Sequence, residues 1–244
     1  MKEIIYSRNA VYETLRAKRR QFIRLLVADK IQEKGHMAEI FELAKERKVP
    51  VERVPRQKLD SLNPQHQGVV LEAGHYPYMD IADILDNAKA KNEPLFVLLL
   101  DTLQDPQNFG TLLRTAEAVS VHGIILPLAR TVEVTPAVVN ASSGASEHLL
   151  IAQSNLVQAI ERLKEAGAWI VGLDEDSRSQ TPDQGRLDGG LAIVVGSEGE
   201  GIRQLVRQKC DFMLCLPMSG KIESLNAAVA GSIVLYLASL ARNK

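Results

Sequence analysis

The chain has 244 residues, of which 45% are hydrophobic and 24% are charged. These values exclude a disordered or fibrous protein and suit a globular chain with one large domain or two modest ones. The apolar stretch at residues 227–241 is too short to cross a bilayer, and the opening MKEIIYSRNA lacks the apolar core of a secretory signal. We therefore expect a cytosolic protein without a membrane span.

The two cysteines, Cys210 and Cys215, lie on one apolar segment. Their number and spacing support neither a disulfide framework nor a zinc site, so packing in the core is their predicted role. The His, Cys and acidic residues nowhere show the spacing of metal ligands, and we expect no metal.

Charge is distributed unevenly along the chain. Residues 1–70 contain 15 Lys and Arg against 9 Asp and Glu, although the whole chain has a net charge of −1. This asymmetry predicts a basic module that meets a polyanion, joined to a larger module with another task. Ordinary solvation of a Lys- and Arg-rich surface is the alternative.

The basic module reads as a small α/β unit over residues 1–75. Its expected elements are a helix from Asn9 to about Lys18, a strand at 22–28, a helix at 37–48, extended pieces at 51–54 and 68–72, and a helix after Pro55. Lys18, Arg19 and Arg20 sit at a helix end, where they either complement the helix dipole or contact RNA. Together with Arg8 they are the candidate RNA-binding residues. Residues 76–92, with a weak helix, are the predicted linker.

From residue 93 to residue 244 strands and helices alternate. The expected strands are 95–100, 123–126, 169–172, 191–195 and 212–216, and the expected helices are 109–120, 155–166, 201–207 and 226–241. Continuous apolar strands indicate a parallel sheet covered on both faces, which makes the protein an α/β protein. The last helix is apolar nearly all round and rich in small residues, so we expect it to be buried, with a second subunit as one candidate cover.

Ligands of open α/β sheets bind beyond the carboxyl ends of the strands, so the loops there are the first candidates for a site. In the first loop, DTLQDPQNFGTLLR, Asn108, Gly110 and Arg114 lie at or inside the start of a helix. Asn108 and Arg114 are six residues apart and share a face only if Asn108 precedes the first turn as its cap. A helix cap followed by a surface arginine is the structural alternative.

The second loop, VVGSEGEGI, places Gly196, Gly199 and Gly201 around two carboxylates. It matches neither the Walker loop nor the dinucleotide fingerprint, so phosphate binding is weakly supported, although its acids could bind hydroxyls. For Glu198 the structural alternative is a carboxylate near the start of the next helix. In the third loop, CLPMSGKIESLN, Ser224 is the expected cap of the last helix, and the amide of Asn226 is free to bond within the loop.

Together, these motifs resemble the SpoU (TrmH) group of RNA ribose 2′-O-methyltransferases in the SPOUT superfamily. The matching segments are Asn108-Phe109-Gly110 with Arg114, residues 196–201, and Leu216-Pro217-Met218 with Ser224-Leu225-Asn226. The resemblance spans the chain, and SRNAVYETL and HQGVV look like the N-terminal domain of the subgroup that modifies a guanosine of 23S rRNA. Ser7, where glycine is expected, and the alanines after Asn226 depart from the family pattern.

The resemblance implies a C-terminal domain tied in a deep trefoil knot, a homodimer, and S-adenosylmethionine as cofactor. The implied cofactor-binding residues are Gly196, Ser197, Gly201, Leu216, Met218 and Leu225. The implied catalytic residues are Asn108, Arg114, Glu198, Ser224 and Asn226. RNA, with 23S rRNA foremost, is the implied partner.

Methyl transfer from a sulfonium to a ribose hydroxyl is an in-line displacement, so the enzyme must align three atoms and remove a proton. Arg114 is a poor base because the pKa of a guanidinium is very high, but it can clamp a phosphate and stabilise an alkoxide. Glu198 is the other candidate base, and the sequence does not choose between them. A tRNA 2′-O-methyltransferase and a non-catalytic RNA-binding protein are the alternative functions, whereas a dehydrogenase would need the missing glycine fingerprint.

Overall fold

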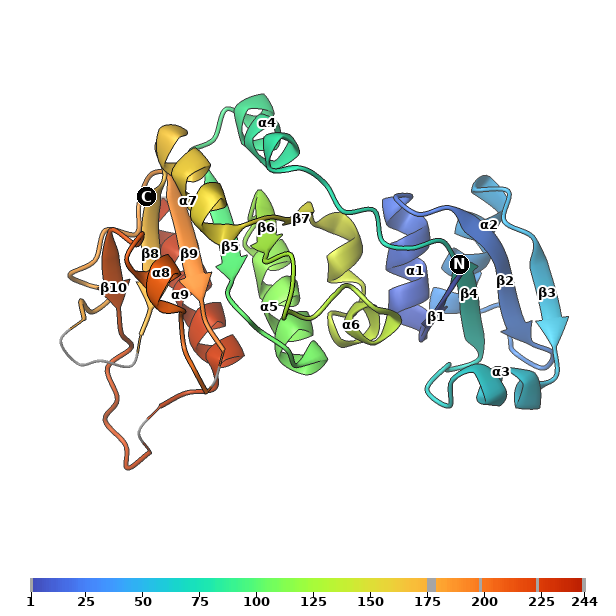
Figure 1. Cartoon of the computed structure of the whole chain (residues 1–244). Helices are drawn as coiled ribbons and strands as arrows, with labels where there is room; N and C mark the ends of the chain where they lie inside the picture. The colour runs from blue at the N-terminus through green and yellow to red at the C-terminus, as the bar shows by residue number, and fades with distance from the viewer. Residues whose placement is uncertain (1, 175–178, 198, 223, 243–244) are drawn as a thin grey trace. The chain divides into compact units, whose positions relative to one another are not determined.

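The computed structural model describes residues 2–174, 179–197, 199–222 and 224–242 (Figure 1). The chain forms two compact units. Unit 1 contains Met1–Pro77 and Glu133–His148, and unit 2 contains Tyr78–Val132 and Leu149–Lys244. The α/β class, with a mixed sheet in the first unit and a parallel sheet in the second, is confirmed.

Unit 1 is built on a four-stranded sheet in the order β1-β4-β2-β3. Its elements are β1 (Glu3–Tyr6), α1 (Arg8–Ala17), β2 (Phe22–Ala28), α2 (His36–Glu46), β3 (Val51–Val54), α3 (Arg56–Leu62), β4 (Val69–Ala73), α6 (Pro136–Ala141) and the 3-10 helix η1 (Ala145–His148). β2 and β3 run parallel, whereas β4 is antiparallel to both β1 and β2. Alternate strand residues such as Leu26, Val54 and Val70 pack on one face with Leu59 of α3.

The segment 133–148 belongs to unit 1 although it is distant in sequence. The side chains of Glu147 and Arg20 form a bidentate pair, with Oε2–Nε and Oε1–Nη2 distances of 2.8 and 2.9 Å. Gly144 has φ +86°, and a Cβ there would lie 2.5 Å from the Cβ of Glu13. The predicted boundary near residue 75 therefore omits part of this unit, because sequence patterns do not show which distant segment completes a core.

The predicted linker, residues 76–92, also differs from the structure. Most of it is helix α4 (Ile81–Lys91), which begins with a capping box at Asp80 and Asp83. Its Ile81, Ile84 and Ala88 are buried in the core of unit 2. These three residues recur at helical spacing, so α4 is a packed element of that unit.

Unit 2 is built on a six-stranded sheet in the order β10-β8-β9-β5-β6-β7, and every pair of neighbours is parallel. Its other elements are β5 (Phe96–Leu100), α5 (Pro106–Ala118), β6 (Gly123–Leu126), β7 (Ile151–Gln153), α7 (Leu156–Glu165), β8 (Trp169–Leu173), β9 (Leu191–Val195), α8 (Gln204–Arg207), β10 (Phe212–Leu214) and α9 (Ala227–Arg242). The five predicted strands are confirmed. The short β1, β7 and α6 went unpredicted, because three to six residues give little periodicity.

Helices cover both faces of this sheet (Figure 1). Ala192 and Val194 of β9 join the core cluster that contains residues of α4, α7 and α8. On the other face, a Cβ at Gly231 of α9 would lie 2.7 Å from Leu112 of α5 and 3.0 Å from Val195 of β9. A side chain at this position would therefore force Leu112 or Val195 to shift where α9 crosses α5. None of the helices among the described residues has the length and apolar character needed to cross a membrane.

Candidate active site

A cavity of about 430 Å³ lies in unit 2 beyond the carboxyl ends of β8, β9 and β10. Its walls come from the loops after these strands, from α8 and from the start of α9. The chain folds this way because apolar strand residues stop where glycine, proline and polar residues begin, and neighbouring parallel strands end at one edge. The cavity therefore lies at the strand ends where the sequence predicts a ligand site.

All six predicted cofactor-binding residues line this cavity. They are Gly196, Ser197, Gly201, Leu216, Met218 and Leu225. Two predicted catalytic residues, Ser224 and Asn226, also line it, whereas Glu198 lies outside the described residues. The second and third motif loops thus meet around one space.

The described part of the glycine loop, residues 196–197 and 199–202, forms one wall of the cavity. Ser197 and Gly201 exchange two backbone hydrogen bonds, with N···O distances of 3.1 and 3.0 Å. A Cβ at Gly196 would lie 2.2 Å from the carbonyl carbon of Gly201, and Gly201 itself has φ +65°. Glycine at these two positions brings the backbone to the surface of the cavity, where a ligand can meet its N–H and C=O groups.

Asn226 caps α9, so the prediction that Ser224 is the cap was wrong. Its Oδ1 accepts hydrogen bonds from the N–H groups of Ala228 and Val229 at 3.0 and 3.1 Å. Its Nδ2 donates to Oδ1 of Asn108 at 3.1 Å. Ser224 lies two residues too early to reach those N–H groups as a cap would. One amide thereby fixes the helix start and links the third motif to the first.

Asn108 is likewise not the cap that its position suggested. Asp105 caps α5 by accepting from the N–H groups of Gln107 and Asn108 at 3.2 and 3.1 Å, so Asn108 lies inside the first turn. Helical geometry then sets Asn108 and Arg114 about 120° apart around the axis. Arg114 is exposed, and neither residue is among the described ones that line the cavity. The structure joins Asn108 to the cavity through Asn226.

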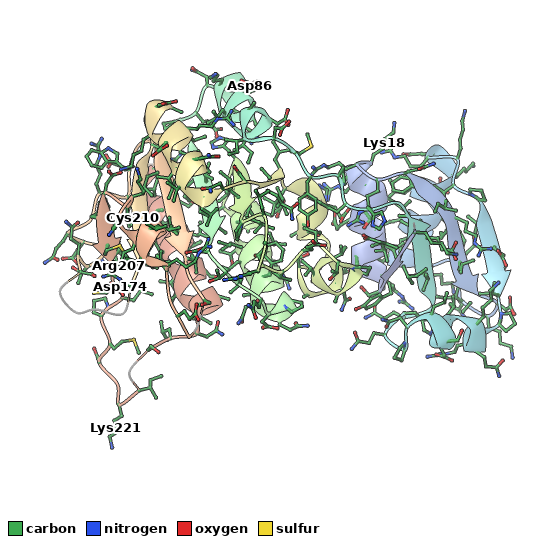
Figure 2. All side chains as sticks on the ribbon, viewed as in Figure 1. Lys18, Asp86, Asp174, Arg207, Cys210 and Lys221 are labelled. Atoms are coloured by element: carbon green, nitrogen blue, oxygen red, sulfur yellow. The ribbon has the colours of Figure 1, made fainter. Side chains whose placement is uncertain are left out.

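Asp174 and Arg207 form an ion pair at the cavity and were not predicted. Asp174 follows the end of β8, and Arg207 ends α8; Figure 2 labels both residues in the same part of unit 2. The rule that sites lie after strand ends could have found Asp174, because it is the first residue beyond the apolar run. The pair gives the cavity both an acceptor and a cation.

The two cysteines play the predicted packing role. Cys215 is buried, and Cys210 (Figure 2) packs so closely on β8 that a Cβ at Gly172 would lie 3.0 Å from its sulfur. Burial raises the pKa of the Cys210 thiol to about 11, which keeps it protonated at neutral pH. Among the residues that the structure describes, no three His, Cys, Asp or Glu side chains gather as metal ligands.

Of the four candidate RNA-binding residues in unit 1, Arg20 is a structural residue. Its side chain is 0% exposed, and it pairs with Glu147 and, at 2.6 Å, with Glu3. Burial works against the Arg20 charge, but the hydrogen bonds and charges of these two carboxylates outweigh it and raise the pKa of the guanidinium. Buried carboxylates need a cation, so Arg20 is not available to RNA.

The other three candidates keep different degrees of access. Arg19 is half-buried and donates to the hydroxyl of Tyr76 at 3.0 Å. Arg8 is exposed but donates to the backbone oxygen of Gln67 at 3.2 Å. Lys18 is exposed at the end of α1, with a left-handed backbone. Among the described contacts, Lys18 is therefore the candidate whose cation is least engaged by the protein itself.

Two family models match the chain. Residues 95–236 match the SpoU rRNA Methylase family, and residues 4–79 match the family described as RNA 2′-O ribose methyltransferase substrate binding. The first match covers more than half of the chain and includes all three motif loops.

Curated relatives match over nearly their whole length. YacO of Bacillus subtilis (strain 168), classed with the TrmH family tRNA/rRNA methyltransferases, is 43% identical over 99% of this chain and 96% of its own length. A Staphylococcus aureus (strain COL) protein classed in the same way is 41% identical over 96% of this chain and 94% of its own.

Solved structures share the fold at lower identity. The SpoU methyltransferase AviRb from Streptomyces viridochromogenes, in complex with AdoMet, has a TM-score of 0.80 and 23% identity, covering 98% of this chain and 90% of AviRb. An AdoMet-bound rRNA methyltransferase from Sinorhizobium meliloti has a TM-score of 0.78 and 22% identity. The match covers 97% of this chain and 86% of the Sinorhizobium meliloti protein.

Proposed function

Because the chain belongs to the SpoU rRNA methylase family of RNA 2′-O-methyltransferases, we propose that it methylates the ribose 2′-hydroxyl of a guanosine in 23S rRNA, with S-adenosylmethionine as the donor. The observation that carries the proposal is that all six expected cofactor residues line one cavity. The names of the relatives include both tRNA and rRNA, so tRNA is the second candidate substrate.

The cavity fits S-adenosylmethionine. Its volume of about 430 Å³ suits a small molecule of this size. Leu216, Leu225 and Met218 offer apolar surface to an adenine, and the close approach at Gly196 leaves backbone groups to bind its edge. The carboxylate of Asp174 can accept hydrogen bonds from hydroxyl or amino groups. When bound, S-adenosylmethionine supplies an electrophilic methyl group on a positively charged sulfur.

Asn226 and Asn108 position the reaction in this proposal. A bond from O2′ to the methyl carbon forms while the carbon–sulfur bond breaks, and the proton leaves O2′, so alignment of the hydroxyl is the large contribution. The amide of Asn226 is held on both sides, by α9 and by Asn108, and is therefore preorganised. The hydroxyl of Ser224, in the same wall, is assigned to holding the ribose.

Arg114 is assigned to the RNA backbone. Its guanidinium is exposed on α5, the helix that carries Asn108, and is suited to clamp a phosphate and to stabilise a developing alkoxide. The very high pKa of a guanidinium makes Arg114 a poor proton acceptor. Glu198, outside the described residues, remains the alternative acceptor of the O2′ proton.

Unit 1 is assigned to RNA binding, through the edge of its sheet where β2 and β3 begin. α1 leads into β2 and α2 leads into the parallel β3, so both helices end at this edge. Lys18 and Lys48 follow those two helix ends and are both exposed. By contrast, Arg24 and Lys58 are paired with carboxylates, which reduces the basic excess seen in the sequence. Lys18 and Lys48 make no ion pair with the residues that the structure describes, and two such cations at one edge suit phosphates.

A homodimer is part of the proposal and is supported by the outer face of α9. Val229, Ile233, Tyr236 and Leu240 are 43, 38, 58 and 49% exposed, and their spacing places them on one side of the helix. Such a continuous apolar stripe is typical of a surface that another protein covers. Light scattering of the wild type should give twice the chain mass, and Tyr236→Lys should give the monomer mass. A monomeric wild type would contradict the dimer.

A transfer assay tests the proposal against its alternatives. The protein is incubated with methyl-labelled S-adenosylmethionine and with unmodified 23S rRNA or tRNA, and label is counted in each RNA. Label confined to 23S rRNA is expected. Label confined to tRNA would give the second substrate, and RNA binding without transfer would make the chain a non-catalytic binding protein. The cytosolic location and the deep trefoil knot expected above belong to the same proposal.

A further inference from the structure

Asp101 is a fully buried carboxylate at the carboxyl end of β5. Its Oδ2 accepts the backbone N–H of Arg203 at 2.8 Å, and its Oδ1 lies 2.7 Å from Nε and 2.6 Å from Nη2 of the same residue. A carboxylate removed from water needs such bonds, because burial without them would be costly. One arginine thus satisfies this charge through both its backbone and its side chain.

Asp101 is hydrogen-bonded to the residues on either side of the glycine loop, Val195 and Arg203. At the start of the loop, the N–H of Asp101 donates to the carbonyl oxygen of Val195 at 2.8 Å. At its end, the carboxylate of Asp101 holds Arg203, the residue that follows the loop. Between these points, Ser197 and Gly201 are bonded to each other. Asp101, the residue that follows β5, is therefore bonded to the chain on both sides of the loop.

Asp101 and Arg203 are not among the described residues that line the cavity, but Gly196, Ser197, Gly201 and Ile202 are. Any effect of the pair on a ligand must therefore pass through the loop backbone. Resting on the proposed function, we propose that Asp101 and Arg203 are positioning residues that hold the glycine loop in the shape that binds S-adenosylmethionine. They lie outside the three motifs that carry the family resemblance.

The experiment measures cofactor affinity and turnover in the full-length chain. Arg203→Met removes the guanidinium, and Arg203→Lys keeps a cation opposite Asp101, which secures folding. We expect the Kd for S-adenosylhomocysteine and the KM for S-adenosylmethionine to rise about tenfold in the Met variant and about threefold in the Lys variant. Turnover at saturating S-adenosylmethionine should stay within about twofold of the wild type, because Arg203 touches no reacting atom.

Lys164→Met is the matched control. The Nζ of Lys164 lies 2.5 Å from Oδ1 of Asp211. The other carboxylate oxygen of Asp211, Oδ2, accepts a hydrogen bond from the backbone N–H of Ile170 at 2.8 Å. This pair also joins a carboxylate to a cation and to a backbone donor, but it is not part of the glycine loop. The control should lower the melting temperature and leave both cofactor constants unchanged.

Three results would overturn the inference. Unchanged Kd and KM in both Arg203 variants, with only a lower melting temperature, would make the pair merely structural. A fall in turnover at saturating cofactor without a change in Kd would place Arg203 at the reaction instead of at the loop. If the wild type itself binds no S-adenosylhomocysteine, the cofactor proposal fails together with this one.

Discussion

The side-chain amides of Asn226 and Asn108 are hydrogen-bonded at 3.1 Å across 118 residues of sequence. This bond joins the start of α9 to the first turn of α5, and so joins two of the three motifs. Because the oxygen of Asn226 is used in capping α9, its amide group has one orientation toward Asn108. The two functions of Asn226, as a cap and as a link, can be separated by substitution.

Asn226→Asp should keep the cap and lose the bond donated to Oδ1 of Asn108, because a carboxylate accepts from the helix N–H groups but has no N–H to donate. We expect stability near that of the wild type and a clear loss of turnover. Asn226→Ala should lose both the cap and the bond to Asn108, and it should lower the free energy of unfolding by about 1 kcal/mol. Urea unfolding and single-turnover kinetics measure the two effects.

Asn155→Ala is the control for this pair of variants. Asn155 caps α7 in the same way, accepting from the N–H groups of Val157 and Gln158 at 3.0 and 3.3 Å. The Asn155→Ala variant should lower the free energy of unfolding as much as Asn226→Ala does and should leave turnover unchanged. Full turnover in Asn226→Asp would remove the Asn226–Asn108 bond from the mechanism.

Arg114→Ala should lower turnover about 100-fold and leave the Kd for S-adenosylhomocysteine within about twofold. The reason is that Arg114 is assigned to the phosphate and the alkoxide, and it lies outside the described lining of the cavity. Arg162→Ala, which removes an exposed arginine from α7, is the control and should change neither quantity. Near-normal turnover of Arg114→Ala would exclude the residue from the site.

Ser7→Gly should stabilise unit 1. Ser7 has φ 74° and ψ 152°, a backbone conformation open almost only to glycine, and its side chain makes no capping hydrogen bond. Releasing this strain should raise the free energy of unfolding by about 1 kcal/mol, after the extra chain entropy of glycine is subtracted. Ser7→Ala should give no such gain. Calorimetry checks both, and equal melting temperatures for all three proteins would show that the position is unstrained.

Lys18→Gln with Lys48→Gln should weaken RNA binding and make it less dependent on salt. Loss of two phosphate contacts should make the slope of log K for RNA binding against log salt concentration less steep by about 1.5. The control, Lys30→Gln with Lys34→Gln, removes the same charge at the opposite edge of the sheet, after the end of β2. Equal effects of the two double variants would show a general charge effect and contradict a binding edge.

Apolar runs predicted the strands well, because a buried parallel strand is apolar on both faces and ends where polar loop residues begin. The prediction of β2 and β3 was correct at every residue. The helix starts were less accurate. Near α5 both Asp105 and Asn108 could act as caps, and near α9 both Ser224 and Asn226 could. Only the structure distinguishes them, through the hydrogen bonds that backbone N–H groups donate to the side-chain oxygens of Asp105 and Asn226.

Site residues that belong to sequence motifs could be predicted. Residues whose role depends on a partner far away in the sequence could not. Gly196, Leu216 and Leu225 line one cavity because they belong to loops at strand ends, and their binding of a cofactor stays a prediction. Arg20 was misread because its partner Glu147 lies 127 residues away, and a buried arginine looks like a surface one in sequence. Asp101 and Arg203 were missed for the same reason.

The position of the methyl group on the product tests the central claim most directly. RNA treated with the enzyme and S-adenosylmethionine is digested with nucleases, and mass spectrometry assigns the added mass to sugar or base. The residues assigned to the reaction above, Asn108, Arg114, Ser224 and Asn226, offer neutral amide and hydroxyl groups and one cation. Such groups suit a ribose hydroxyl beside a phosphate, so the methyl should lie on O2′ and one phosphodiester should resist alkali. A methylated base with an unmodified ribose would contradict the account.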